Sequence, residues 1–218
     1  DLKMRGKDKI AVIYASGSIE SGEGNENSIG SDKISRAIRS ARSDSSVKAV
    51  VFRINSPGGS ALASEVIWRE INLTKKTKPV VVSMGDYAAS GGYYIACPAN
   101  KIFAQSTTLT GSIGVFGLIP NMQKFFSDKL GVTFDNVNTN KHSDYISAVR
   151  AMDPYEQLVL LNMIERIYST FINHVAEGRN ISVAHVDSIG QGRVWNGIDA
   201  KRIGLIDEIG GLNDAIKV

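Results

Sequence analysis

Apolar residues are grouped along the chain in short runs that are typical of buried strands. The clearest runs, IAVIYASGSI and VFRI, are followed by glycine, serine and asparagine residues, which end a strand and begin a loop. The segment 20–30 is so rich in these residues that we expect a loop there. Strands are predicted at residues 9–19, 47–54, 79–84, 101–105, 113–116 and 132–138.

Other segments carry apolar residues at intervals of three and four, which predicts amphipathic helices. The longest begins after Asp153 and Pro154 and ends near Gly178. Helices are predicted at residues 32–43, 61–74, 120–130 and 153–178. Because strands alternate with helices, and parallel strands need crossover connections, the pattern predicts an α/β fold with a largely parallel sheet.

Composition narrows the classes of function. The chain has 218 residues, of which 43% are hydrophobic and 22% charged, as in a globular domain. Its net charge of +3 comes from mixed acidic and basic residues, so no nucleic-acid partner is expected. One cysteine, Cys97, excludes an internal disulfide, and no metal, P-loop or dinucleotide motif is found, so no metal or cofactor is expected. No apolar stretch is long enough to span a membrane, and the start at Asp1 suggests a fragment of a longer protein.

Two glycine-containing turns follow predicted strands. In residues 56–59 (SPGG), proline fixes one φ angle and the glycines let backbone N–H groups face a ligand, as in an oxyanion hole; an ordinary tight connection explains the turn equally well. In residues 88–92 (AASGG), Ser90 is flanked by small residues at the start of a helix, so it is either an exposed nucleophile or an N-cap. Together, the two turns favour catalysis.

The remaining ionisable residues give weaker signals. His142, His174 and His185 are far apart in the sequence, and we interpret each as a structural or exposed histidine. Asp86 precedes the serine turn without a histidine that would complete a triad, which favours a structural role for it.

Four segments resemble the signal peptide peptidase A family, a group of serine proteases with the fold of ClpP and the crotonases. The resemblance implies an α/β, ClpP/crotonase-like fold of repeated ββα units with a parallel sheet and flanking helices. It also implies that residues 1–218 form a single peptidase domain, the C-terminal half of a longer chain. The segments that carry it are 55–59, 85–96, 110–115 and 197–211.

The same resemblance implies roles for individual residues. Ser90 is the acylated nucleophile, the N–H groups of Gly59 and Gly91 form the oxyanion hole, and Ser112 orients the general base. Substrates are hydrophobic peptides such as cleaved signal peptides, bound by strand addition, for which we expect edges at 47–54 and 113–117.

The general base in this family is a lysine, whose pKa must fall from about 10.4 to about 7 or 8 in a desolvated site. Here Ser143 stands where single-domain members carry that lysine. Three sources remain open. The lysine comes from an N-terminal domain or a neighbouring subunit, which we favour, or the base is Lys141 or His142.

Assembly and location follow from the resemblance alone. It implies a homo-oligomer, a tetramer-like ring, on the outer face of the bacterial cytoplasmic membrane, anchored by segments that this chain lacks. Two rival functions stay open. One is an inactive ClpP-like assembly domain, which the absent lysine favours. The other is a crotonase-like thioester enzyme that binds coenzyme A, which the glycine-flanked serine disfavours.

Overall fold

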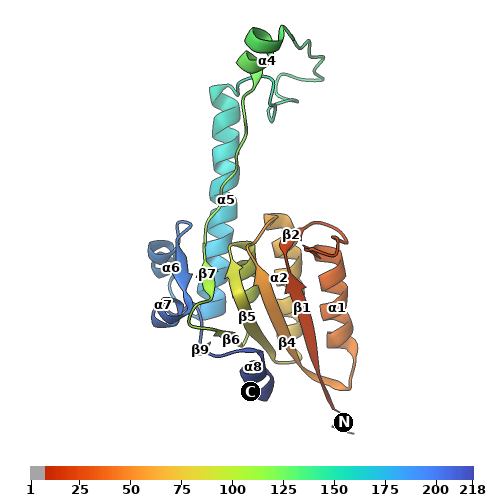
Figure 1. Cartoon of the computed structure of the whole chain (residues 1–218), viewed down its shortest axis with the longest axis vertical. Coiled ribbons are helices and arrows are strands. Elements are labelled where there is room, and N and C mark those ends of the chain that lie inside the picture. The colour runs from red at the N-terminus through yellow and green to blue at the C-terminus, as the bar shows by residue number, and fades with distance from the viewer. Residues whose placement is uncertain (1–7) are drawn as a thin grey trace. The chain divides into compact units, whose positions relative to one another are not determined.

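The computed structural model describes residues 8–218, which divide into two compact units. The first unit holds residues up to Gly114 together with Thr170–Val218, and the second holds Val115–Ser169. The long helix α5 (Pro154–Arg179) begins in the second unit, and its residues from Thr170 onward belong to the first. Figure 1 shows the elements of each unit.

The first unit is built on a mostly parallel seven-stranded sheet (Figure 1). The strand order is β1-β4-β5-β6-β9, with β7 paired to the end of β5 and β8 antiparallel to β7. A small parallel ladder joins β2 to β3. The strands are β1 (Lys9–Ser16), β2 (Ser18–Glu20), β3 (Ser28–Gly30), β4 (Val47–Ser56), β5 (Val80–Ala89), β6 (Lys101–Ala104), β7 (Leu109–Gly111), β8 (Val194–Asn196) and β9 (Glu208–Ile209).

Helices connect and cover these strands, as the alternating pattern predicts. Helices α1 and α2 pack against each other, and α2 packs against α3. Helix α8 joins a core cluster in which Ala215 meets Val51, Val81 and Phe103. The helices are α1 (Ser31–Ser43), α2 (Ala61–Lys75), α3 (Gly91–Ala96), α6 (Val183–Ile189), α7 (Gly197–Arg202) and α8 (Leu212–Lys217).

The core lies on the two central strands. Phe52 and Ile54 of β4 and Val82 and Met84 of β5 are at most 1% exposed, as expected for parallel strands that are covered on both faces. Tyr93 of α3 is also fully buried, and its hydroxyl donates to the carbonyl oxygen of Leu205 at 2.7 Å. The helix that follows Ser90 is therefore fixed in the core.

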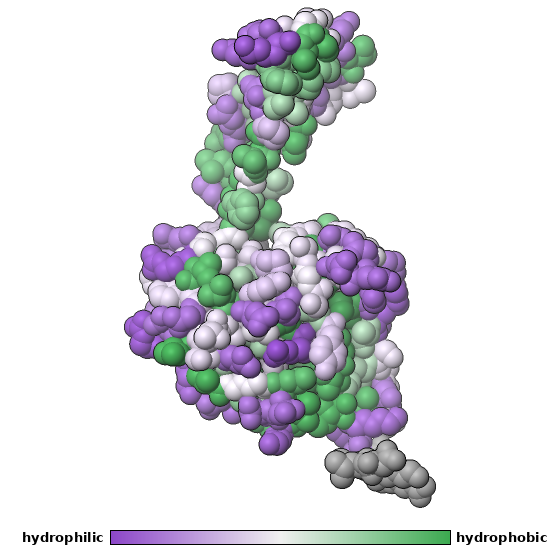
Figure 2. Space-filling model, viewed as in Figure 1, coloured by the Kyte–Doolittle hydropathy of each residue, from purple (hydrophilic) through white to green (hydrophobic). Residues whose placement is uncertain are grey.

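The second unit has little interior of its own. Besides its part of α5 it contains one helix, α4 (Gln123–Leu130), and Glu156 is its one buried residue. Large apolar side chains lie on its surface, among them Phe116, Leu118 and Val137, which are 89–99% exposed (Figure 2). Among residues 8–218, no helix combines the length and apolar character that crossing a lipid bilayer requires.

The α/β class with a parallel sheet is confirmed, but several predicted strands are wrong. Residues 113–116 and 132–138 form no strand, and the nearest strand to the first of them is β7. Residues 132–138 are exposed and have no neighbouring strand to pair with, so their apolar side chains are not a sign of a core. The loop predicted at 20–30 ends in the short strand β3. Strand β4 pairs with β1 on one side and β5 on the other, so the edge expected at 47–54 for a peptide does not exist.

Candidate active site

Two turns that are 34 residues apart in the sequence meet at one edge of the sheet. Strands β4 and β5 are parallel neighbours, and Ser56 at the end of β4 pairs with Ala88 near the end of β5. Strands β4 and β5 therefore end at the same edge of the sheet, as the carboxyl ends of neighbouring parallel strands do. The glycine turn after β4 and Ser90 after β5 are brought together by this pairing.

Ser90 has an unusual backbone conformation. Its φ is 52° and its ψ −120°, a region that residues other than glycine rarely adopt. Its N–H donates to the carbonyl oxygen of Gly111 at 2.9 Å, and its own carbonyl oxygen accepts from the N–H of Tyr94 at 2.9 Å. Ser90 holds the N-cap position of α3, but its hydroxyl makes no capping hydrogen bond. The side chain is thus available for chemistry, and a strained backbone held on both sides is typical of functional sites.

The turn after β4 is shaped by two glycines with positive φ, +105° at Gly58 and +151° at Gly59. Ile19 pairs with this turn, donating to the carbonyl oxygen of Gly58 at 2.8 Å and accepting from the N–H of Ser60 at 2.8 Å. Glycine is also required for space, because a Cβ on Gly58 would lie 2.8 Å from the Cβ of Ser90. Gly58 therefore permits the close approach of the turn to Ser90.

Two backbone N–H groups near Ser90 are free. Within residues 8–218, neither the N–H of Gly59 nor that of Gly91 donates to a carbonyl or a side chain. The two groups are close, since a Cβ on Gly91 would lie 3.2 Å from the nitrogen of Gly59. Free N–H groups beside a serine hydroxyl are able to stabilise a negatively charged oxygen, as an oxyanion hole does.

Ser112 lies next to the same edge. Strand β7 pairs with the end of β5, with Gly111 opposite Ala89, and Ser112 follows directly with a φ of 48°. Its N–H donates to the carbonyl oxygen of Arg193 at 2.8 Å. Because the carbonyl oxygen of Gly111 accepts from the N–H of Ser90, Ser112 follows a residue that is bonded directly to Ser90.

Two candidate bases belong to the second unit. Lys141 is exposed in a turn of the second unit, and His142 is next to it. In the described part of the first unit, no lysine or histidine hydrogen-bonds the Oγ of Ser90. His174 is bonded to Glu65 and His185 to the carbonyl oxygen of Ile203.

Asn55 is a further residue of the site, and the sequence alone predicted no role for it. Its Oδ1 accepts from the N–H of Asp86 at 2.9 Å and from that of Tyr87 at 3.3 Å. This holds the end of β4 to β5 just before Ser90. Because these bonds join residues more than 30 positions apart, no local pattern in the sequence indicates them. Asp86 itself is exposed, and its backbone N–H, not its carboxylate, forms the hydrogen bond to Asn55.

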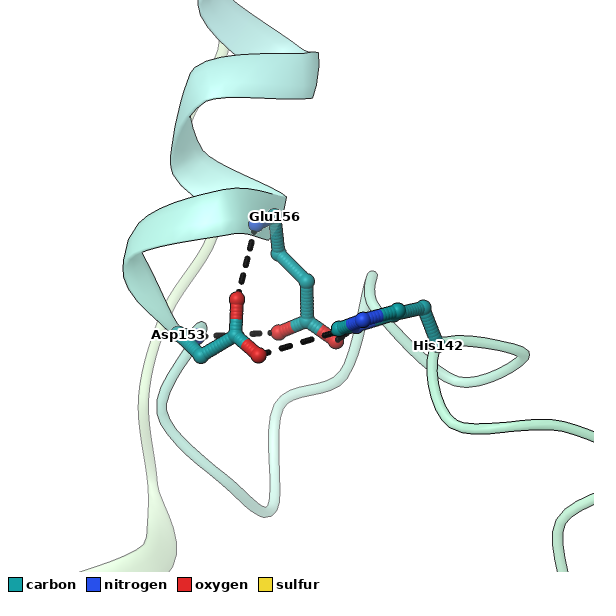
Figure 3. Close-up of side chains that lie close together, drawn as sticks. All are labelled: His142, Asp153 and Glu156. Atoms are coloured by element: carbon teal, nitrogen blue, oxygen red, sulfur yellow. Dashed lines mark hydrogen bonds and ion pairs between the residues drawn. The ribbon is translucent and has the colours of Figure 1, made fainter.

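Three side chains of the second unit have the residue types of a metal site. Ligand atoms of His142, Asp153 and Glu156 lie within 4.8 Å of one another (Figure 3). The Nδ1 of His142 is 3.0 Å from Oε1 of Glu156. A cation is already bound to this group, because the guanidinium of Arg150 donates to both oxygens of Glu156, at 2.8 and 2.6 Å. The cluster is therefore a network that holds the loop, with Arg150 in the place of an ion.

Arg150 also determines the ionisation of its partners. It donates to both oxygens of Asp144, at 2.9 and 2.7 Å, and these bonds lower the pKa of Asp144 to about 2. The hydrogen bonds from Arg150 likewise hold the pKa of Glu156 well below its usual range. Both carboxylates are charged at neutral pH, and the segment from 142 to 156 is bound at its two ends.

Comparison with known proteins places these residues in a wider group. The protein-family model for "Peptidase family S49" matches residues 72–218 of the chain. The chain is 48% identical over 208 residues to Protease 4 of Salmonella typhi, covering 95% of this chain and 33% of that protein. It is 41% identical over 218 residues to the chloroplastic serine protease SPPA of Arabidopsis thaliana, covering 98% of this chain and 32% of the relative. The chain thus spans about a third of the length of these relatives.

A solved structure agrees on the fold. A ClpP1 variant from Listeria monocytogenes superposes with a TM-score of 0.63 at 18% identity, over 94% of each chain. This likeness confirms the ClpP-like arrangement of the sheet and helices.

Proposed function

The chain belongs to peptidase family S49, and from this premise we propose that it is the serine-bearing part of an endopeptidase that works through an acyl-enzyme on Ser90. The observation that carries the proposal is the meeting of a strained serine with two free backbone N–H groups, those of Gly59 and Gly91. This is the arrangement that acyl transfer requires.

The proposed reaction has two halves. The Oγ of Ser90 attacks the peptide carbonyl carbon while a base takes its proton, and the carbonyl oxygen becomes negative between the N–H groups of Gly59 and Gly91. The intermediate collapses to an ester on Ser90, and the leaving amine takes the proton from the base. Water then attacks the ester while the same base takes its proton. The ester bond breaks, the base returns the proton to the Oγ of Ser90, and the peptide acid is released.

We assign the base to a lysine from another domain of a longer protein or from a neighbouring subunit. Two observations support this. A lysine base needs a site that excludes water so that its amine is neutral, and Lys141 is exposed. The Oγ of Ser90 makes no bond to a basic side chain within the described part of its own unit. Ser112 follows Gly111, whose carbonyl oxygen accepts from the N–H of Ser90, and it is the residue we propose to orient the incoming amine.

Hydrophobic peptides such as cleaved signal peptides are the proposed substrates. Leu62, three residues after Gly59, is 70% exposed and offers an apolar surface beside the turn. Ala63 and Ala88 are at most 1% exposed, so they belong to the core and do not form pockets.

We further propose a homo-oligomer, a tetramer-like ring, on the outer face of the bacterial cytoplasmic membrane. The exposed apolar side chains of the second unit support an assembly, because a patch of this kind on a protein is usually covered by a partner. Residues 1–218 then form one peptidase domain within a longer chain.

The test is peptide hydrolysis by the 218-residue chain and by the longer protein, each beside its Ser90→Ala variant. We expect hydrolysis only by the longer protein, and its loss in Ser90→Ala. Serine-dependent hydrolysis by the 218-residue chain would refute a lysine supplied by another domain or subunit, and the Lys141→Ala variant would be measured next. Hydrolysis that survives in Ser90→Ala would refute the acyl-enzyme on Ser90, and no hydrolysis in either protein would favour an inactive assembly domain.

A further inference from the structure

The two free N–H groups beside Ser90 are attached to different helices. Gly59 lies just before Ser60, the N-cap of α2, and Gly91 is the first residue of α3. The distance between the two N–H groups therefore depends on how these two helix ends are held together. The two helix ends approach closely, because a Cβ on Gly91 would lie 2.6 Å from the Oγ of Ser64 in α2 and 3.2 Å from the nitrogen of Gly59.

One side-chain hydrogen bond joins the two helices near these ends. The hydroxyl of Tyr94, one turn after Ser90, donates to Oε2 of Glu65, which lies in the first turns of α2. Burial, followed by the hydrogen bond to the Glu65 carboxylate, raises the pKa of Tyr94. The phenol therefore keeps its proton and remains the donor throughout the neutral range.

The acceptor of this bond is itself fixed from α5. The Nε2 of His174 is 3.0 Å from the same Oε2 of Glu65, and since a carboxylate only accepts, Nε2 carries the hydrogen. The imidazole ring stacks on Trp68, with centroids 3.5 Å apart and planes 16° apart, and its edge meets Tyr94. The ring of Tyr94 also packs against the ring of Phe171, and the centroids of these two rings are 4.7 Å apart. Tyr94 is thus held by the carboxylate of Glu65 and by two ring contacts at the same time.

From this geometry we infer that Tyr94 and Glu65 are positioning residues of the peptidase reaction, with His174 holding the carboxylate. Their hydrogen bond sets the separation of the Gly59 and Gly91 N–H groups. The inference rests on the proposed function, in which those groups bind the oxyanion. In this role the two side chains act through the backbone of Gly59 and Gly91, so their contribution is to the transition state and not to substrate binding.

The first experiment compares variants of the longer protein in steady-state peptide hydrolysis. Tyr94→Phe removes only the hydroxyl, and we expect kcat to fall about tenfold with KM unchanged, the loss equivalent to one hydrogen bond. Tyr14→Phe is the matched control, because Tyr14 is 63% exposed on β1, a strand that packs mainly on β4 and α1 rather than on α2 or α3. It should leave both constants unchanged.

A double-mutant cycle then tests whether the two residues act together. Glu65→Gln keeps an oxygen acceptor and should retain most of the rate, whereas Glu65→Leu should be as slow as Tyr94→Phe. The double variant Glu65→Leu with Tyr94→Phe should be no slower than either single variant. Additive losses, a rise in KM with kcat unchanged, or full activity of Tyr94→Phe would each overturn the inference.

A second measurement does not depend on activity. Amide hydrogen exchange of the segments 57–65 and 88–97 should be faster in Tyr94→Phe than in the unchanged protein, and that of β1 should be equal. Equal exchange in both segments would overturn the inference even if the enzyme is active. Absence of any Ser90-dependent hydrolysis together with faster exchange would refute the proposed function but leave the link between the helices in place.

Discussion

Replacing Gly58 by alanine is the sharpest test of the site geometry. The new Cβ would lie 2.7 Å from the nitrogen of Gly91, 2.8 Å from the Cβ of Ser90 and 3.0 Å from the carbonyl oxygen of Ala89. Unstrained contacts between such atoms are about 3.5 to 4.0 Å, so the turn and Ser90 must separate by about 1 Å. The nucleophile would thus move away from the N–H group of Gly59, which is on the same turn as Gly58.

The expected effect has two parts. A φ of +105° disfavours alanine by about 1 to 2 kcal/mol, which lowers the melting temperature by about 2 to 8 °C in a chain of this length. A displacement of about 1 Å at the reacting atoms lowers the rate by about 100-fold. The rate therefore falls far more than the loss of stability alone would explain.

Gly22→Ala is the matched control for this prediction. Gly22 has a φ of +83°, so alanine is strained there as well, but no atom lies within 4 Å of its added Cβ. The assay is the rate at which a fluorophosphonate modifies Ser90 in the longer protein, followed by mass spectrometry, with thermal unfolding measured in parallel. Equal modification rates in Gly58→Ala and Gly22→Ala would refute the close approach of the turn to Ser90.

Three further predictions concern the parts around the site. Burial opposes ionisation of Glu70, but hydrogen bonds from two guanidinium groups of α1 lower its pKa below 4.5. The charged carboxylate therefore stabilises the folded protein above pH 4.5, and this stabilisation is lost as the pH falls through the lowered pKa. Glu70→Gln should therefore reduce the free energy of unfolding by about 2 kcal/mol near neutral pH, with the difference shrinking in acid, as urea titrations at several pH values would show. In Arg150→Gln, the pKa of Asp144 should rise from about 2 towards about 3.9, measured by carboxyl carbon NMR; an unchanged value would contradict the network. The Cys97 thiol is fully buried, which raises its pKa, so a thiol reagent should modify it only at the rate of unfolding, and fast modification of the folded protein would contradict the core.

The site was largely predictable because its geometry depends on local chemistry. Glycine at 58 and 59 permits positive φ and close approach, and the residues around Ser90 are small; both features are visible in the sequence. Parallel pairing then brings the two turns together without further information. The contact of Tyr94 with Glu65 was not predictable, since it joins residues 29 apart whose side chains are ordinary for helices.

The second unit was predicted poorly for a physical reason. Its apolar residues, such as those at 132–138, indicate strands only if they are buried within the same chain, and here they are exposed. Hydrophobic periodicity shows that a side chain needs cover but does not show what supplies it. Ser143 and Lys141 belong to this unit, so the identity of the base was equally beyond the reach of the pattern.

The antiparallel pairing of β7 with β8 has a consequence for the synthesis of the protein. Ser112 and Gly111 are held by residues 193 and 194, which are made more than 80 residues after them. A chain that is still growing on the ribosome lacks this support, so its β7 has no partner on that side when Ser90 has already emerged. The backbone support of Gly111 and Ser112 is therefore complete only after residues 193 and 194 have been translated.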